Sequence, residues 1–273
     1  MKLIDSKIEN ISQTDFSLQG IYKQIEKAGR TCYKSEDKIT DDSAESFVKM
    51  LLDRGHYAML EHGIVHLKFP FMSDRAKKYE LDPYSDISHI SVADDDEEPE
   101  YNSYVTTNFR VIVGNGWQSD LEEFLDTDNI EMYEPVYSYR ITCDRGVSHE
   151  LVRHRVFSFA QESTRYCNYS KDKFNKQLTF IKPYWLNESN ATDYMKKLFL
   201  EHCRESEALY MCYINNGMKP QEARAILPNA LKTEIVVTGF RRNFVRMLSL
   251  RNTTAAHPDM QIIAKMINDD IRK

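Results

Sequence analysis

Residues 150–166 read ELVRHRVFSFAQESTRY, and this stretch says more about fold and chemistry than any other part of the chain. Four chargeable cations, at positions 153, 154, 155 and 165, stand among valine and phenylalanine residues, so part of the segment must be buried. Guanidinium groups bind phosphate or carboxylate oxygens, and serine hydroxyls can complete the hydrogen bonding of an oxyanion. The stretch therefore predicts a site for a small polyanionic ligand. Charge spacing alone leaves one alternative open, a solvated or salt-bridged helix end.

The rest of the composition is that of a folded acidic protein. The chain has 273 residues, 41% of them hydrophobic, and a formal net charge of −6. This length is sufficient for a substantial core. Residues 74–100 contain ten acidic and three basic residues, whereas residues 219–251 contain seven basic and two acidic ones. The acidic balance argues against a general nucleic-acid binder, and the second segment predicts a local cationic site.

The sequence gives no sign of export, membrane insertion or metal binding. It contains no run of eighteen apolar residues, and charges occur at the amino terminus where a signal peptide needs an apolar stretch. The five cysteines are scattered and include no C-x-x-C pair, while His62 and His66 lack an H-E-x-x-H context. We expect a cytoplasmic protein without a membrane span, a disulfide framework or a metal site.

Hydrophobic periodicity predicts an α+β fold, with helices around a small, mainly antiparallel sheet. Alternation predicts strands at 64–69, 108–113 and 137–142, which together would form the sheet. Helical spacing and capping residues predict the following helices: 16–28 closed by Gly29, a helix capped at Asp42 or Ser43 and ending before Gly55, 147–157, 192–216, a short one between Pro220 and Pro228, one starting at Thr233 or Gly239, and 258–271.

The 150–166 stretch resembles the signature R-H-R-x-x-S-x-x-x-x-S-x-R of the flavin-dependent thymidylate synthases (ThyX family), with Arg153-His154-Arg155, Ser158, Ser163 and Arg165 in the fixed positions. Further similar segments occur in the family's order. They are 28–33 and 55–62 upstream, and Ala223-Arg224 to Pro228 and Leu248 to Arg251 downstream. The resemblance implies a ThyX-like fold in one domain, residues 1–273, with an insertion at about 70–134.

The resemblance also implies an activity. Members of the family methylate dUMP reductively to dTMP, with methylenetetrahydrofolate as carbon donor and FAD as hydride carrier, which NADPH reduces. They are homotetramers whose active sites are shared between subunits, and no enzyme cysteine attacks the uracil ring. The same resemblance therefore implies dUMP and folate substrates, and neither nucleic acid nor a membrane as partner.

The family's roles can be carried onto individual positions. Arg251 matches the catalytic arginine that favours loss of the uracil N3 proton, since a fixed cation stabilises a developing anion. The predicted dUMP site contains Glu150, Arg153, Gln161, Glu162, Ser163, Thr164, Arg165, Arg224 and Arg251. The predicted FAD site contains His56, Ala58, Arg153, His154, Arg155, Gln161, Arg242 and Arg246. Ala58, Ala160 and Phe240 stand where family members often have polar residues, which removes those side-chain contacts.

The sequence allows two rival functions to be compared with this one. A cysteine-dependent thymidylate synthase is disfavoured, because no cysteine here follows a proline as that enzyme's nucleophile does. A non-catalytic module that binds nucleotides or nucleic acid through its arginine-rich segments is the alternative from another class. Such a module would show steep salt dependence and no flavin binding.

Overall fold

The computed structural model describes residues 1–92, 100–187 and 191–273. Helices and small sheets are mixed along this part of the chain, so the predicted α+β class is confirmed. Residues 93–99 of the acidic segment 74–100 lie outside the described residues. No helix in these three ranges is both long and apolar enough to span a bilayer.

The main sheet has four antiparallel strands in the order β2-β6-β9-β7. Their bounds are β2 (Lys7–Asn10), β6 (Val136–Asp144), β7 (Ser158–Gln161) and β9 (Lys232–Phe240). Strand β9 pairs with β6 along its whole length and with β7 on its other edge. It is therefore an interior strand, and its Ile235, Val236 and Val237 are all buried.

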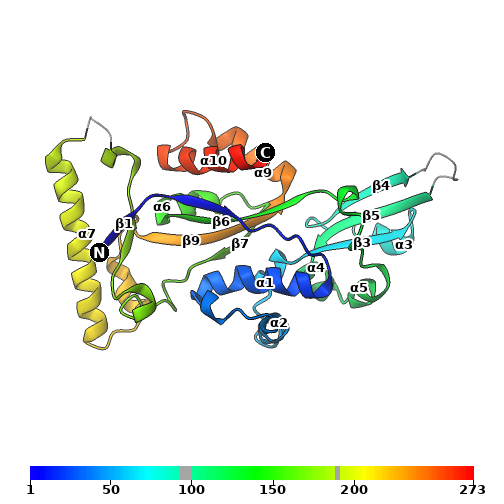
Figure 1. Cartoon of the computed structure of the whole chain (residues 1–273), viewed down its shortest axis with the longest axis horizontal. Coiled ribbons are helices and arrows are strands. Elements are labelled where there is room, and N and C mark those ends of the chain that lie inside the picture. Colours follow the sequence, from blue (N-terminus) through cyan, green and yellow to red (C-terminus); the bar gives the residue numbers. More distant parts are fainter. Residues whose placement is uncertain (93–99, 188–190) are drawn as a thin grey trace.

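Alternate residues of this sheet face two different layers. Tyr139 and Ile141 of β6 lie in one core cluster with Ile235 and Val237 of β9. Val236, between them, lies in a separate cluster on the other face. Figure 1 shows the helices of these layers on opposite sides: α9 (Arg241–Arg251) and α10 (Pro258–Ile271) on one, α1 (Leu18–Tyr33) and α2 (Ser43–Asp53) on the other.

A second sheet, in the order β3-β5-β4, is built mainly from the predicted insertion. Its elements are β3 (Ile64–Pro70), α3 (Asp74–Lys77), β4 (Asp86–Val92), β5 (Glu100–Asn108), α4 (Phe109–Asn115) and α5 (Gln118–Phe124). Val105 and Ile112 share a core cluster with Ile25 of α1 and Phe47 of α2. The insertion thus completes the core of the amino-terminal third and is more than a surface elaboration.

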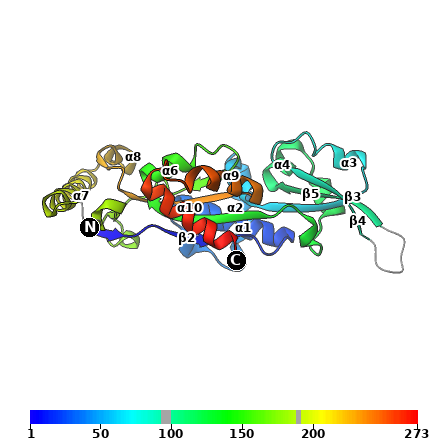
Figure 2. The same cartoon turned by 90° about the horizontal axis from the view of Figure 1, so that it is seen from above.

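The remaining elements lie at the opposite end of an elongated molecule, as both views show (Figures 1 and 2). They are β1 (Lys2–Ile4), which pairs in parallel with β8 (Thr179–Ile181), together with α7 (Asp193–Asn215) and α8 (Pro220–Ala223). Helix α6 (Arg145–Leu151) packs on the main sheet. Short 3₁₀ turns are η1 (Glu36–Lys38), η2 (Tyr57–His62), η3 (Ile130–Met132), η4 (Asp172–Phe174), η5 (Tyr184–Asn187) and η6 (Arg224–Ile226).

Several predicted elements are confirmed, and capping explains why. The predicted helix at 192–216 is α7, whose N-cap Thr192 accepts a hydrogen bond from the Met195 N–H. The predicted helix at 258–271 is α10, with Pro258 in its first turn. The strands expected at 64–69 and 137–142 are β3 and β6, and the short helix beginning at Pro220 is α8.

One predicted strand and one of the two predicted starts of a helix are wrong. Residues 109–113 lie in helix α4, because the Asn108 side chain accepts a hydrogen bond from the Val111 N–H and caps a helix there. The expected single three-stranded sheet therefore does not form, since β3 and β6 belong to different sheets. Of the two starts expected for the following helix, Thr233 is wrong because it lies in strand β9, whereas Gly239 lies two residues before the observed start of α9 at Arg241.

Two predicted helix ends are also wrong. Helix α1 continues through Gly29 to Tyr33, and this glycine serves close packing, because a side chain there would collide with the Phe47 ring of α2. The helix expected at 147–157 ends at Leu151. The Arg-His-Arg segment consequently lies in the turn before β7.

Candidate active site

The turn from Arg153 to Val156 connects α6 to β7 and lies over the end of β9. Phe157, at the end of this turn, is buried against Phe244 of α9. Its ring occupies the space that a side chain at Gly239 would need, so glycine allows the strand and the turn to approach closely. Packing of one phenylalanine therefore orients the whole arginine-rich turn.

Three predicted site residues meet at the carboxyl end of α9. Arg251 Nη1 donates to Glu150 Oε2 at 2.9 Å, and Arg251 Nε donates to His154 Nε2 at 2.9 Å. The three come from α9, from the end of α6 and from the turn. We call them the Arg251 cluster. Its hydrogen bonds occupy Nε and Nη1, which leaves Nη2 to donate to a ligand.

The ionisation of the Arg251 cluster follows from its surroundings. Burial and then the neighbouring Arg251 charge lower the pKa of His154 below its ordinary value of 6.5. The imidazole is therefore neutral near pH 7 and can accept the hydrogen bond from Arg251. The guanidinium is held between the Glu150 side chain and a neutral acceptor. The cluster presents an oriented cation without the cost of orienting it during a reaction.

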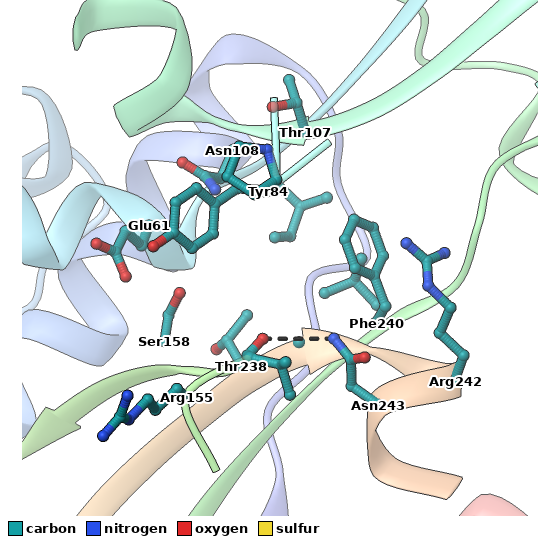
Figure 3. A pocket seen from close by; sticks show the side chains of 15 residues that line it. Glu61, Tyr84, Thr107, Asn108, Arg155, Ser158, Thr238, Phe240, Arg242 and Asn243 are labelled. Atoms are coloured by element: carbon teal, nitrogen blue, oxygen red, sulfur yellow. Dashed lines mark hydrogen bonds between the residues drawn. The ribbon is translucent and has the colours of Figure 1, made fainter. Parts of the chain in front are cut away.

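Two further predicted residues, Arg155 and Arg242, line one cavity of about 250 Å³ (Figure 3). We call it the Arg155 pocket. One wall comes from the main sheet and α9, and it includes Ser158, Thr238 and Phe240. The remaining lining residues are Glu61, Ile64, Pro83, Tyr84, Thr107, Asn108, Val136, Val156, Gly239 and Asn243.

Arg242 is held in place at the edge of the Arg155 pocket. Its Nη1 lies 2.7 Å from Asp86 Oδ1 and 3.5 Å from Glu134 Oε1. Its guanidinium lies 4.2 Å above the centre of the Phe240 ring. A stacked and paired arginine has few alternative positions, so the shape of this wall is well defined.

A second group of cations gathers near the start of α8. Arg224 Nη1 donates to Thr164 Oγ1 at 3.5 Å, and Arg165 Nε donates to Gln221 Oε1 at 3.2 Å. The Ser163 hydroxyl oxygen accepts from the Arg165 N–H at 3.3 Å. We call these five residues the Arg165 cluster. Neither guanidinium has a carboxylate partner among the residues that the structure describes, so both remain available to an anion.

The predicted ligand residue Glu162 faces inward. It is 2% exposed, accepts from Tyr169 at 3.0 Å and lies 2.8 Å from Lys232 Nζ. Lys232 also pairs with Glu234 at 2.7 Å. Burial alone would raise the pKa of Glu234, but Lys232 and Lys34 outweigh it and lower the value to about 2. This chain of charges fixes the backbone that carries the Arg165 cluster.

The other predicted residues have separate positions. Gln161 Nε2 donates to Ser148 Oγ at 2.9 Å and to Thr233 Oγ1 at 3.2 Å. His56, whose Nδ1 lies 3.2 Å from the Tyr33 hydroxyl, is exposed. Exposed side chains also occur at Ala58, Arg153 and Arg246. No hydrogen bond or ion pair within the described ranges joins the Arg251 cluster, the Arg155 pocket and the Arg165 cluster to one another.

Residues from two parts of the chain contribute to these sites without having been predicted from the sequence. Lys232 stands two positions before Glu234, and in a strand this spacing places both on one face, so the pattern was detectable. Tyr84 and Asp86 belong to the insertion, and no local pattern links them to Arg155 or Arg242. Only the tertiary fold brings them to the Arg155 pocket.

Burial raises the thiol pKa of four of the five cysteines. Burial raises the pKa of Cys32 and Cys167 to about 12 and that of Cys203 to about 11. Burial also raises the pKa of Cys143. These four remain thiols, which are poor nucleophiles. In the part of the chain that the structure describes, no three His, Cys, Asp or Glu side chains are grouped as a metal site.

Comparison with known proteins places these clusters in a family. The sequence profile of the family described as thymidylate synthase complementing protein matches residues 130–273, more than half of the chain. The chain belongs to this family. The resemblance drawn from the 150–166 stretch is thus confirmed. The matched region contains the Arg251 and Arg165 clusters, whereas Tyr84 and Asp86 lie outside it.

Two relatives illustrate the similarity within the family. The flavin-dependent thymidylate synthase of Pyrococcus furiosus is 34% identical over 168 residues, and that of Geobacter sulfurreducens is 29% identical over 162 residues. Each alignment covers 59% of this chain and 62% of the relative. A crystal structure of the UMP/dUMP methylase PolB from Streptomyces cacaoi, bound with 5-Br dUMP, superposes over 99% of this chain and 91% of its own. Its TM-score is only 0.46 at 15% identity, too low to support further conclusions.

Proposed function

We propose that the protein is an FAD-dependent thymidylate synthase that methylates dUMP reductively to dTMP. The observation that carries the proposal is Arg251, paired with Glu150 and hydrogen-bonded to a neutral His154 beside the arginine-rich turn. A uracil that loses its N3 proton becomes an anion, and a preoriented guanidinium stabilises that anion. In this proposal Nη2 of Arg251 is the donor to the base, and Glu150 and Gln161 orient the ring.

The residues of the Arg155 pocket fit part of a flavin dinucleotide. Arg155 and Arg242 supply positive charge for phosphate oxygens, and Phe240 supplies an apolar ring face. A volume of about 250 Å³ is slightly below the usual range for small-molecule sites, so the pocket would take one ring system rather than a whole dinucleotide. The remaining cofactor contacts would come from the exposed residues His56, Ala58, Arg153 and Arg246. When bound, the flavin supplies the hydride, with methylenetetrahydrofolate as carbon donor and NADPH as reductant.

The Arg165 cluster is the proposed site for the dUMP phosphate. Arg165 and Arg224 lack carboxylate partners in the described part of the chain, and hydroxyls stand beside them at Ser163 and Thr164. Paired guanidinium donors match the geometry of phosphate oxygens. Glu162 contributes by holding the backbone of this segment through Lys232.

We propose a homotetramer with shared active sites, as the family resemblance implies. Arg153, Arg165, Arg224 and Arg246 are exposed, so they can reach a neighbouring subunit. A neighbouring subunit that docks its Arg165 cluster against another's Arg251 cluster would complete the site. All five cysteines are free, which supports a reducing, cytoplasmic location. Small-molecule substrates, rather than nucleic acid or a membrane, remain the proposed partners.

The test is an assay of dTMP formation. Purified protein is mixed with dUMP carrying tritium at C5, methylenetetrahydrofolate, FAD and NADPH, and tritium release and dTMP are both measured. We expect both products, and we expect none when the folate is omitted. A protein that neither forms dTMP nor binds FAD would contradict the proposal. Steeply salt-dependent binding of nucleic acid by such a protein would then favour the non-catalytic alternative.

A further inference from the structure

The insertion supplies an aromatic side chain to the Arg155 pocket. Tyr84 precedes β4 and lines the cavity together with Pro83, although the pocket's cations come from the other sheet. Tyr84 is 50% exposed, and its side chain makes no hydrogen bond within the described residues. In Figure 3 the Tyr84 ring lies across the cavity from Arg155 and Thr238.

The segment that carries Tyr84 is firmly anchored. The Tyr84 N–H donates to Asp82 Oδ1 at 2.8 Å, and the Ser85 hydroxyl lies 2.8 Å from Thr107 Oγ1 of β5. Two residues beyond Tyr84, Asp86 pairs with Arg242 at 2.7 Å. The backbone that carries the exposed ring is therefore held on both sides by polar contacts. A backbone fixed before binding loses little conformational entropy when a ligand stacks on the ring.

We propose that Tyr84 is a stacking residue for the flavin ring system in the Arg155 pocket, so that the insertion forms one wall of the cofactor site. This inference rests on the proposed function. The ion pair between Asp86 and Arg242 positions Tyr84 by tying the insertion to helix α9. The exposed face of Tyr84 and the phenyl face of Phe240 then offer aromatic surface on two sides of the cavity.

The test compares Tyr84→Ala with a matched control from the same sheet. Tyr101 of β5 is 53% exposed, packs against Phe71 and does not line the pocket. FAD is titrated into the intact apoprotein of each variant, and the affinity and the emission of the bound flavin are recorded. We expect about tenfold weaker FAD binding by Tyr84→Ala, in line with the usual energy of ring stacking. We also expect stronger emission, because a stacked tyrosine quenches flavin fluorescence.

Two controls decide the interpretation. Tyr84→Phe keeps the ring and should bind FAD nearly as tightly as the wild type, and Tyr101→Ala should leave the affinity unchanged. Equal FAD affinity and emission in the wild type and Tyr84→Ala would overturn the inference while leaving the proposed function intact. Equal weakening by Tyr84→Ala and Tyr101→Ala would also overturn it. A wild-type protein that binds no FAD would overturn the proposed function itself, and this inference with it.

Discussion

Asp120 and Glu162 are buried carboxylates beside different sheets, and their charges are balanced differently. Asp120 of α5, beside the insertion sheet, is 0% exposed and faces two cations, Lys78 and Arg75. Glu162, which follows β7 of the main sheet, is 2% exposed and shares its lysine, Lys232, with a second carboxylate. Asp120 of the insertion therefore keeps one cation if the other is lost. Glu162 pairs with Lys232 alone among the described residues and shares it with Glu234, which also pairs with Lys34 at 2.9 Å.

This comparison predicts the largest effect for Lys232→Met. The substitution leaves Glu162 buried without a cation, which typically costs about 3–5 kcal/mol of unfolding free energy. Lys78→Met is the matched control, with an expected loss of about 1 kcal/mol, because Arg75 still faces Asp120 and the Tyr79 hydroxyl still donates to it at 2.7 Å. Urea unfolding of both variants measures the difference. Equal losses would show that the two clusters are energetically alike.

A second comparison sets a proposed catalytic arginine of the main half against a structural one of the insertion. Arg251→Ala removes the donor to Glu150 and His154, and we expect dTMP formation to fall by about 10²–10³-fold with the fold retained. Arg75→Ala should lower the free energy of unfolding and leave turnover per folded molecule unchanged. Steady-state turnover and thermal unfolding are measured for both. Normal turnover by Arg251→Ala would refute its catalytic assignment.

Acid should weaken the contact between the halves through two buried histidines. Burial lowers the pKa of His62 to about 4 and that of His66 to about 3. Unfolded histidine titrates near 6.5, so between pH 6.5 and 4 the unfolded state binds more protons and stability rises with pH. Above about pH 6.5 the two histidines no longer reduce the free energy of unfolding. Between pH 6 and 5 we expect that free energy to fall by roughly 2 kcal/mol as the pH is lowered.

The control for this pH dependence is His62→Gln. A glutamine can keep the hydrogen bond that His62 Nδ1 shares with Thr238, at 2.8 Å, and it does not titrate. Urea unfolding at several pH values should give about half the wild-type slope between pH 6 and 5. An unchanged slope would assign the acid sensitivity to other groups.

The smallest effect is expected for the ion pair that bridges the two sheets. Asp86 is 26% exposed and Arg242 is 47% exposed, so solvent screens the pair. Asp86→Asn should cost less than about 1 kcal/mol, seen as a decrease of a few degrees in the melting temperature. Glu201→Gln, at an exposed pair on α7, is the control. A much larger loss for Asp86→Asn would mean that this pair holds the halves together.

The helices that could be predicted from the sequence begin at residues whose own chemistry favours a helix start. Thr192 and Pro258 mark helix starts through their own chemistry, and α7 and α10 begin where expected. The failures at 108–113 and 232–240 concern apolar runs whose state is decided by tertiary packing: Ile112 joins the core of α1, and Ile235 pairs with Ile141. The hydrophobic periodicity of these two segments does not show which one forms a helix and which one forms a strand.

The candidate site divides in the same way. The motif residues Arg153, Arg165 and Arg251 are recognisable by spacing, yet spacing does not tell that Arg251 contacts His154. Glu162 has the expected position beside Ser163, but its side chain is buried against Lys232. Tyr84 was not predictable, because its relation to the pocket exists only after two sheets have packed together.

The central position of β9 has a consequence for synthesis on the ribosome. Strands β6 and β7 both pair with β9 and not with each other, and β9 is the last strand of the chain. At ~5–20 residues per second, several seconds separate the emergence of Gln161 from that of Phe240. During this interval the edges of both earlier strands stay open to other nascent chains. Slow translation before Lys232 should therefore promote aggregation more than slow translation after it.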